Sequence, residues 1–276
     1  MRGVQALALA AAVASSGCAS GYRHTARTVI RPAAEGNASE PRPGRWFNPP
    51  HSLAVAEDAV VRIVGPSMTC TGTLIEDDLV LTAHHCVVER TASGGFSRQK
   101  VDAGELRVEL GGDYLPWGEV KTRAIVTPPC GERGGAGDVA VLVLSRKLVG
   151  LPTMTARLER APRNGEVVDP MGFGRCATSE GGIHRRVRDG GTIRAVSNET
   201  MMLDASVCPG DSGGPVVVRG SHEVVGVISL SARDGDERTR AASIMARIDA
   251  FRTVFAHARL IADGVPANEL PPLECR

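Results

Sequence analysis

The sequence has almost no net charge and few helical patterns. Its 276 residues carry a formal net charge of +1, so the chain lacks the strong positive excess that indicates binding to nucleic acid. Apolar residues recur at helical spacing only near the C-terminus. Glycine and proline are frequent instead, with 32 and 17 residues. These features predict an all-β chain of many short strands joined by turns.

The apolar run near the N-terminus is too short to span a bilayer. It covers residues 4–14 and is followed by three small residues and then Cys18. This pattern is typical of a secretory signal peptide, and the residues before Cys18 resemble a bacterial lipobox. We therefore expect removal of residues 1–17 and lipidation of Cys18, which predicts an exported lipoprotein of the bacterial cell envelope, facing the periplasm or the outer surface. Cleavage near Ala19 with secretion of the free protein is the alternative.

Residues 18–52 are rich in Arg, Pro, Ala, Gly and Glu and show no periodicity. Such a composition predicts a flexible tether. The lipid at Cys18 is then the only membrane contact that we expect. If Cys18 carries lipid, an even number of cysteines remains to pair in an oxidising compartment. These are Cys70, Cys86, Cys130, Cys176, Cys208 and Cys275.

Residues 208–215 have the sequence Cys-Pro-Gly-Asp-Ser-Gly-Gly-Pro. Gly210 and Gly213 permit backbone torsions that a side chain forbids, so the N–H groups of Gly210 and Ser212 can turn toward one point and bind a developing oxyanion. A glycine-rich turn that contains serine by chance is the alternative. All eight residues, however, resemble the active-serine signature of the chymotrypsin-like (trypsin-fold) serine proteases.

Two upstream segments resemble the rest of that family's catalytic triad. Residues 83–86, Ala-His-His-Cys, are similar to the Thr-Ala-Ala-His-Cys segment of the family, which makes His85 the base. The alternative is a zinc site, but no second cluster supplies the missing ligands. Asp138 stands before an apolar run that predicts a buried strand and resembles the family's Asp-Ile-Ala-Leu-Leu segment. The order His, Asp, Ser is that of the chymotrypsin class.

The resemblance implies a role for each of these residues. His85 accepts the proton of Ser212 and returns it to the leaving amine, and Asp138 orients the imidazole. The N–H groups of Gly210 and Ser212 bind the oxyanion. The implied protein is a monomeric serine endopeptidase that acts on peptides or proteins and needs neither a metal ion nor an organic cofactor.

The family fold implies two six-stranded antiparallel β-barrels, in residues 53–155 and 156–265, followed by a C-terminal tail in residues 266–276. His85 and Asp138 come from the first barrel and Ser212 from the second. A C-terminal helix belongs to the second barrel, and its apolar stripe is expected to pack there. The stripe consists of Ile244, Ile248, Phe251, Phe255 and Ala258.

The residues at the expected specificity pocket differ from those of the basic-specific members. Counting back from Ser212, Ser206 occupies the position of their aspartate, so we do not expect cleavage after Arg or Lys. Residues Ser229, Leu230 and Ser231 resemble the substrate-aligning strand, with Ser231 in place of a glycine. The resemblance then implies a narrower, polar pocket for small or medium uncharged residues.

The activation signal of the family is also missing. No Ile-Val-Gly-Gly start lies between Cys18 and Leu53, and the similar stretch at residues 62–65 lies inside the first predicted strand. We therefore expect Asp211 to pair with an internal arginine rather than with a new N-terminus. The enzyme would then be active without cleavage.

The separation of Cys70 and Cys86 matches the family's histidine-loop disulfide. The usual partner of Cys208 is absent, because no cysteine follows Leu230 until Cys275. In this fold Cys176 begins a loop near residue 208, so we expect a Cys176–Cys208 bond, which leaves Cys130 to pair with Cys275. Free or intermolecular thiols are the alternative.

Three other functions fit parts of the sequence. One is a catalytically inactive relative that serves as a binding module of the envelope, although the triad residues and Gly210 are all present. Another is an esterase, which the lack of a strand–turn–helix elbow disfavours. The third is a regulatory protease with one envelope partner, which the sequence does not distinguish from a degradative one.

Overall fold

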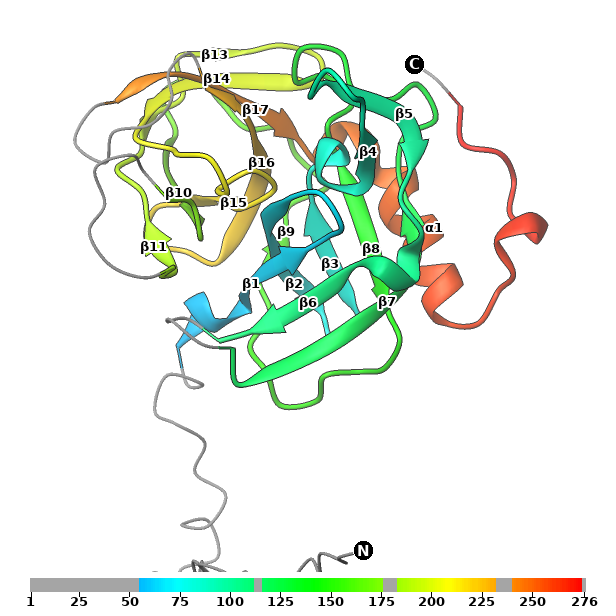
Figure 1. Ribbon diagram of the computed structural model, residues 1–276. Helices are drawn as coiled ribbons and strands as arrows, with labels where there is room; N and C mark the ends of the chain where they lie inside the picture. Colours follow the sequence, from blue (N-terminus) through cyan, green and yellow to red (C-terminus); the bar gives the residue numbers. More distant parts are fainter. Residues whose placement is uncertain (1–54, 112–115, 176–182, 232–239, 275–276) are drawn as a thin grey trace, which may run out of the picture. The chain divides into compact units, whose positions relative to one another are not determined.

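Two sheets of short strands form the framework of the described part of the chain (Figure 1). The computed structural model describes residues 55–111, 116–175, 183–231 and 240–274. The predicted signal peptide, tether and lipidation site therefore lie outside the described residues. None of the helices within those ranges is long and apolar enough to span a membrane.

The first sheet is a closed antiparallel barrel in the order β1-β2-β3-β8-β7-β6. The meander predicted from residue 60 to residue 82 forms its first three strands. The barrel strands are β1 (Val60–Val64), β2 (Thr69–Glu76), β3 (Leu79–Thr82), β6 (Arg107–Leu110), β7 (Gly118–Val126) and β8 (Ala140–Leu144).

The barrel interior explains the residue types of its strands. β8 is apolar and buried at all five positions, because it lies between β3 and β7 and is covered on both faces. In β2, Gly72 faces the interior, and a Cβ there would lie 2.7 Å from both Ile63 Cδ1 and Val80 Cγ1. Only glycine fits at this point of the barrel.

The second sheet follows the order β11-β10-β15-β16-β17-β14-β13, with β12 beside β10 and β9 beside β16. Four of these strands have only two residues, so the sheet contains more and shorter pieces than the six predicted strands. The strands are β9 (Thr155–Ala156), β10 (Val167–Gly172), β11 (Arg186–Val187), β12 (Gly191–Thr192), β13 (Ala195–Val196), β14 (Thr200–Ala205), β15 (Pro215–Val218), β16 (Glu223–Ser231) and β17 (Ala241–Arg247).

A separate two-stranded hairpin and several short helices lie outside these two sheets. The hairpin pairs β4 (Val88–Arg90) with β5 (Phe96–Lys100). The 3-10 helices are η2 (Ala56–Ala59), η3 (His84–Val87), η4 (Ala103–Glu105), η5 (Asp249–Phe251) and η6 (Ala267–Glu269).

The α-helix α1 (Arg252–Ala262) is shorter than its predicted apolar stripe and packs elsewhere. Ile244 lies in β17, where it is part of the ladder with β14 and β16. The helix buries Val254, Phe255 and Ala258 and contacts β3, β7 and β8. The expectation that it packs against the second barrel is therefore wrong, since all three strands belong to the first.

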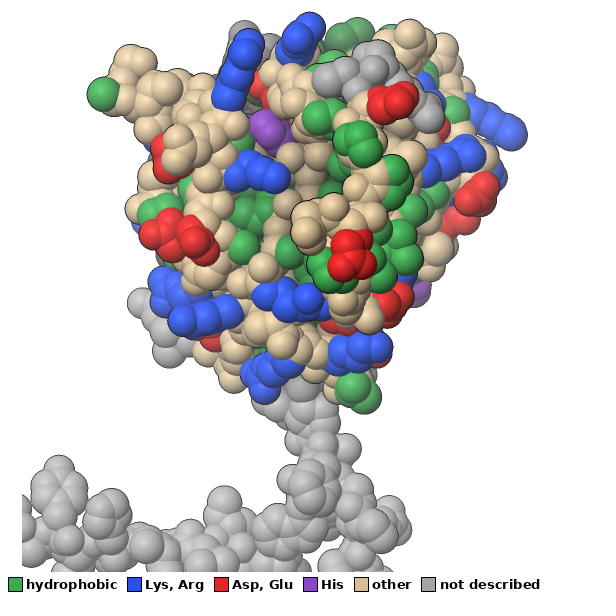
Figure 2. All heavy atoms as spheres, turned by 90° about the vertical axis from the view of Figure 1, so that its right-hand side faces the viewer, with side chains coloured by type: hydrophobic (Ala, Val, Ile, Leu, Met, Phe, Trp, Pro, Cys, Tyr) green, Lys and Arg blue, Asp and Glu red, His purple; other side chains and the backbone are tan. Residues whose placement is uncertain are grey.

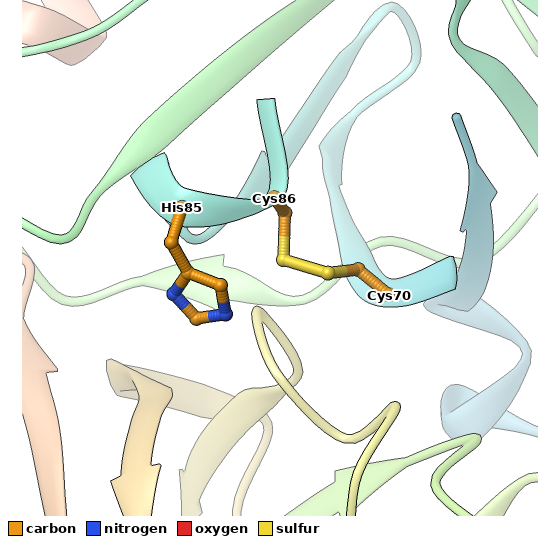
Figure 3. Close-up of side chains that lie close together, drawn as sticks. All are labelled: Cys70, His85 and Cys86. Atoms are coloured by element: carbon orange, nitrogen blue, oxygen red, sulfur yellow. A yellow bond between two sulfur atoms is a disulfide. The ribbon is translucent and has the colours of Figure 1, made fainter. Parts of the chain in front are cut away.

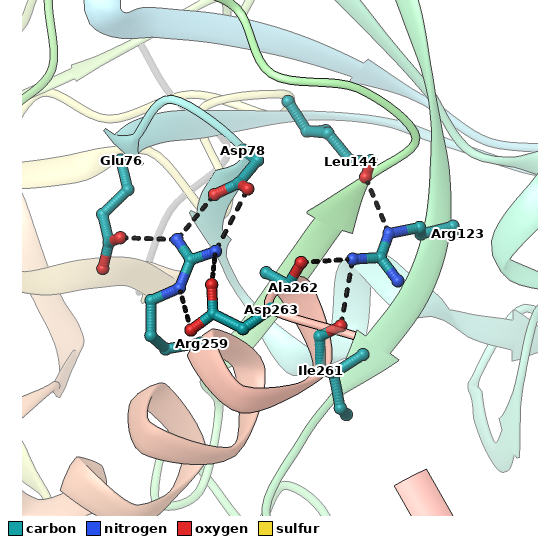
Figure 4. Close-up of polar contacts among 8 residues, drawn as sticks. All are labelled: Glu76, Asp78, Arg123, Leu144, Arg259, Ile261, Ala262 and Asp263. Carbon is teal, nitrogen blue, oxygen red and sulfur yellow. Dashed lines mark hydrogen bonds and ion pairs between the residues drawn. The ribbon is translucent and has the colours of Figure 1, made fainter. Parts of the chain in front are cut away.

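Two arginines hold α1 on the first barrel (Figure 4). Arg123 of β7 donates hydrogen bonds to the carbonyl oxygens of Ile261 and Ala262, at 3.0 and 2.9 Å. These carbonyls lie in the last turn of the helix, where no N–H four residues further on belongs to the helix. That of Ile261 also accepts the N–H of Gly264 at 3.0 Å. From the helix itself, Arg259 binds the buried carboxylate of Asp78 through two nitrogens, at 2.7 and 3.1 Å. An apolar stripe shows which face of a helix is buried. These polar contacts determine which barrel that face packs against.

Replacing Arg259 by glutamine is expected to lower the free energy of unfolding by about 1–2 kcal/mol at pH 7, because Asp78 loses a charged, two-point partner. Hydrogen bonds from Arg259 hold the pKa of Asp78 below its ordinary value. A carboxyl group whose pKa is lower in the folded state stabilises the fold above its unfolded pKa, and this contribution is lost as the pH falls through the folded value. Urea unfolding should therefore show a difference between the two proteins that shrinks below about pH 4.

Arg252→Gln is the matched control on the same helix. Its ion pair with Glu159 spans 3.9 Å between exposed side chains, so the change is expected to cost less than about 0.5 kcal/mol. Equal effects of the two substitutions, or a difference that does not depend on pH, would contradict the role given to Arg259.

Candidate active site

The short helix η3 places His85 at the end of β3, beside a disulfide (Figure 3). Cys86, the next residue, is bonded to Cys70 of β2. The predicted Cys70–Cys86 bond is therefore present. It joins the helix that carries the histidine to a neighbouring barrel strand, which restricts how far the histidine can move.

The zinc alternative was based on His84, His85 and Cys86, and the structure places Cys70 beside the last two. The possible ligand atoms of Cys70, His85 and Cys86 lie within 4.8 Å of one another. The two sulfur atoms are bonded to each other, however, so they offer no thiolates to a metal ion. One nitrogen of His85 is also hydrogen-bonded to a carboxylate. This cluster does not fit a zinc site.

His85 and Asp138 form a buried pair with two hydrogen bonds. The backbone N–H of His85 donates to Asp138 Oδ1 at 2.9 Å, and His85 Nδ1 lies 2.8 Å from Oδ2. Ser229 Oγ donates to the same Oδ2 at 2.5 Å. A carboxylate accepts hydrogen bonds, so Nδ1 carries the proton and Nε2 is left as the proton acceptor.

Two opposing effects act on the charge of Asp138. Burial alone would raise the pKa of the carboxyl group. The neighbouring His85 and the hydrogen bonds from His85 and Ser229 outweigh it, so the pKa of Asp138 lies below its ordinary value. Asp138 therefore remains a carboxylate at neutral pH.

In the loop between β14 and β15, the N–H groups on both sides of Asp211 donate to no acceptor among the described residues. The N–H groups of Asp211, Gly213 and Gly214 donate to backbone carbonyl oxygens at 2.8–3.0 Å. Those of Gly210 and Ser212 donate to none of the described residues. Gly210 has a φ of 97°, which few other residues adopt, and this torsion sets the alternation. The loop thus presents two unpaired N–H donors, one from Gly210 and one from Ser212 itself.

Ser212, Gly210 and His85 line one pocket of about 340 Å³. No hydrogen bond joins Ser212 to His85 among the described residues. Such bonds are often long in an empty site and tighten when substrate binds. The predicted nucleophile, base and oxyanion donors therefore open to the same space, and their catalytic roles stay predictions.

Asp211 is fully buried and paired with an arginine, as the sequence predicts. Arg188 Nε lies 2.7 Å from Asp211 Oδ2, and the N–H groups of Gly174 and Cys208 donate to the carboxylate at 2.6 and 2.8 Å. Burial raises the pKa of Asp211, while Arg188 and these two N–H groups act against the shift. The paired carboxylate fixes the residue directly before Ser212.

The sequence alone did not identify this arginine. Arg185, Arg186 and Arg188 stand close together in the chain. Arg188 directly follows β11, and its N–H donates to the carbonyl oxygen of Pro170 in β10 at 2.7 Å. Its side chain is buried, whereas Arg185 pairs with Asp58. Gly174 provides the space, because a Cβ at that position would lie 2.4 Å from Asp211 Cγ.

Three of the four predicted specificity residues line the pocket. Ser229, Leu230 and Ser231 line the pocket, but the hydroxyl of Ser229 is committed to Asp138. Ser206 is buried and does not belong to the described lining. Its hydroxyl accepts the N–H of Asp189 at 3.0 Å.

Sequence reasoning missed two residues beside His85. The ring of Phe96 lies 5.0 Å from the His85 ring, between centroids, and Arg90 stacks on Phe96. Both belong to the β4–β5 hairpin, whose sequence carries no known catalytic motif. The one available signal was an arginine and a phenylalanine placed on either side of a glycine-containing turn.

The second set of disulfides extends beyond the described residues. Cys130 and Cys208 are both disulfide-bonded. Their predicted partners, Cys275 and Cys176, fall outside the described ranges. The pairings Cys176–Cys208 and Cys130–Cys275 therefore stay predictions.

Comparison with known proteins decides the family. A family model described as trypsin matches residues 50–255. The chain belongs to the trypsin family. Trypsin iota of Drosophila melanogaster is 29% identical to it over 61% of this chain and 70% of that protein. Seminase of the same fly is 31% identical over 58% of this chain and 62% of its own length. Hypodermin-B of Hypoderma lineatum is 29% identical, with 58% and 66% covered.

Solved structures share the fold of this trypsin-family chain. A Glu endopeptidase in complex with MPD has a TM-score of 0.56 at 20% identity, covering 74% of this chain and 91% of its own. An inactivated protease paralogue of the scabies mite, S-I1, has a TM-score of 0.55 at 16% identity, covering 75% and 96%. The predicted fold class, a chymotrypsin-like double β-barrel with a C-terminal helix, is confirmed.

Removing the buried cation should destabilise the protein strongly. Arg188→Met leaves the charge of Asp211 buried without its partner, and we expect a loss of about 3–5 kcal/mol in the free energy of unfolding. Adding Asp211→Asn should recover part of this loss, since the unpaired charge is then gone. Chemical denaturation of the single and double variants measures the coupling.

The matched control is Arg194→Gln. Arg194 is mostly exposed and pairs with Asp204 at the surface, so its loss is expected to cost less than about 1 kcal/mol. If Arg188→Met costs no more than this control, or if the two changes at the buried pair are simply additive, the ion pair does not hold the loop.

Proposed function

We propose that the protein is a serine endopeptidase with His85, Asp138 and Ser212 as its catalytic triad. The observation that carries the proposal is the alignment of three features at one pocket. His85 has its Nδ1 side fixed by a charged Asp138, Ser212 lines the same space, and the N–H groups of Gly210 and Ser212 have no other described partner.

The proposed reaction runs through an acyl-enzyme. Ser212 Oγ attacks the carbonyl carbon of the peptide bond while His85 Nε2 takes the hydroxyl proton. The carbonyl oxygen becomes an oxyanion and accepts hydrogen bonds from Gly210 and Ser212. The tetrahedral intermediate collapses, the C–N bond breaks, and His85 returns the proton to the leaving amine. Water then attacks the ester by the same steps and releases the acid.

A catalytically inactive binding module of the cell envelope is the second candidate. The fold does not exclude it, since the similar structures include a paralogue described as inactivated. The residues favour catalysis, because the His85–Asp138 pair and the serine loop are complete. An esterase with the same triad would use the same pocket, but the family supports peptide and protein substrates.

Activity without zymogen cleavage is part of the proposal. Arg188 already forms an ion pair with Asp211. No new N-terminus is therefore needed to order the residue before Ser212. We also propose export, with a lipid anchor at Cys18 and a monomeric catalytic domain that needs no cofactor. Mass-spectrometric reading of the active form tests the first point, and a required new N-terminus at an Ile or Val near residue 45 would contradict it.

The proposed specificity is for uncharged residues of small or medium size before the cleaved bond. A preference for Arg or Lys needs a carboxylate at the pocket floor. None of the described lining residues is Asp or Glu. Ser231, which stands in place of the family's glycine, lines the pocket and would narrow its entrance for a substrate side chain. A peptide library cleaved mainly after Arg or Lys would overturn this part of the proposal.

Ser212→Ala is expected to reduce turnover of peptide substrates by at least about 100-fold while leaving the fold intact, because the nucleophile is lost and its hydroxyl supports no packing. Labelling by a fluorophosphonate probe should disappear with it. His85→Ala should behave alike. Turnover is measured with a peptide library, and the fold is checked by circular dichroism and thermal unfolding.

His84→Ala is the neighbouring control. His84 is buried, and burial lowers the pKa of its imidazole, but it has no contact with Asp138 comparable to that of His85. We expect a milder loss of activity. An essential His84 with a dispensable His85 would move the proposed base by one residue, and full labelling of Ser212→Ala would place the nucleophile elsewhere.

A further inference from the structure

An exposed aromatic ring and a cation lie beside His85 and have no role in the reaction proposed above. We propose that Phe96 and Arg90 form a subsite on the leaving-group side, which selects substrates with an acidic residue in the first two positions after the cleaved bond. This inference rests on the proposed endopeptidase function. It assigns a substrate class to a part of the site that the triad does not use.

The hairpin fixes the two side chains next to each other. Arg90 of β4 and Phe96 of β5 are direct partners in the strand register, so their side chains lie on the same face. Arg90 Cζ lies 4.3 Å from the centre of the Phe96 ring, which is within the range of a cation–π contact. Arg90 Nη1 also donates to the carbonyl oxygen of Gly94 at 2.8 Å. These two contacts hold the guanidinium in place and leave its other N–H groups available.

The position of Phe96 locates this cation at the site. Its ring lies 5.0 Å from the His85 ring, at an angle of 49°, yet 42% of the residue is exposed to solvent. An aromatic residue that packs on the proposed base and remains half open provides an apolar floor for a bound chain. Substrate atoms that approach His85 therefore pass over Phe96 and close to Arg90.

The pocket has two sides, divided by Ser212 and His85. Residues of the second sheet and its serine loop form one side, including Leu230 and Ser231 of the strand that resembles the family's substrate-aligning strand. The first half of the chain forms the other side, with Met68, Thr69, Arg90 and Phe96. His85 delivers its proton to the leaving amine, so the residues after the cleaved bond lie on this second side.

The charge of this side points to an acidic substrate. Arg90 has no carboxylate partner among the described residues. Apart from His85 it is also the one ionisable side chain in the described lining of the pocket. The same hairpin carries Arg98 and Lys100, which line the adjoining hollow together with Arg133 and one acidic residue, Glu132. Figure 2 shows the face that carries β5 and α1, with Lys and Arg side chains at its upper edge and again across its lower part. An unpaired cation above an apolar floor attracts a carboxylate.

Acyl transfer tests the subsite directly. The full chain is acylated at Ser212 by an N-acetyl amino acid ester with a small side chain, and added dipeptide amides compete with water for the acyl group. The amine nitrogen forms the new C–N bond, the Ser212 ester C–O bond breaks, and the proton passes through His85 back to Ser212. The probes are Glu-Gly and Gly-Glu amides, compared with Gln-Gly and Gly-Gln amides.

We expect transfer to the Glu probe to exceed transfer to its Gln counterpart by about threefold to tenfold at one of the two positions, because a charge-assisted contact at an exposed site contributes modestly. Arg90→Gln should bring that ratio to about one. Arg90→Glu should transfer the acyl group faster to the corresponding Lys dipeptide amide than to the Glu dipeptide amide. Added salt should lower the wild-type ratio. Arg146→Gln, an exposed basic residue after β8, is the control and should keep it.

The outcomes separate the two proposals. If the ester is not turned over, or if its turnover does not require Ser212, both the endopeptidase and the subsite are overturned. Turnover with equal transfer to Glu and Gln probes would overturn the subsite alone. A preference for Glu that survives in Arg90→Gln would also overturn it, since the selection would then come from other residues.

Discussion

The buried ion pair between Arg188 and Asp211 is the interaction on which the site depends. It takes two charged groups out of water, which is costly unless both are paired and hydrogen-bonded. Here Gly174 and Cys208 supply N–H groups to the carboxylate as well. The loop is thereby fixed at the residue before Ser212. Its alternation of used and unused N–H groups follows from this anchor and from the torsion of Gly210.

One threonine connects this loop to the first barrel. Thr71 of β2 donates its N–H to the carbonyl of Ser212 and its hydroxyl to the carbonyl of Gly210, both at 2.8 Å. Its hydroxyl accepts the N–H of Phe173 at 2.9 Å. β2 also carries Cys70, which is bonded to the helix of His85. The proposed base and nucleophile are therefore positioned from adjacent residues of one strand, although they come from different halves of the chain.

Sequence reasoning succeeded where the information was local. The β1–β3 meander, the disulfide beside His85 and the gathering of His85, Asp138 and Ser212 at one place follow from short motifs. It failed where a partner far along the chain decides the outcome. The apolar stripe of α1 indicated a buried face, but Arg123 and the β2–β3 turn set which barrel covers it. Arg188 and the Arg90–Phe96 contact depend on strand register, which no pattern within either segment determines.

The attachment of α1 to the first barrel has a consequence for the order of events during synthesis. The strands that form this barrel end at Leu144, yet the helix that covers β3, β7 and β8 begins only at Arg252. A growing chain thus carries an uncovered apolar surface on its first half until the segment that forms α1 has been made. A product that ends before Arg252 cannot bury that surface. Synthesis of this helix is in this sense a condition for the barrel that holds His85 and Asp138.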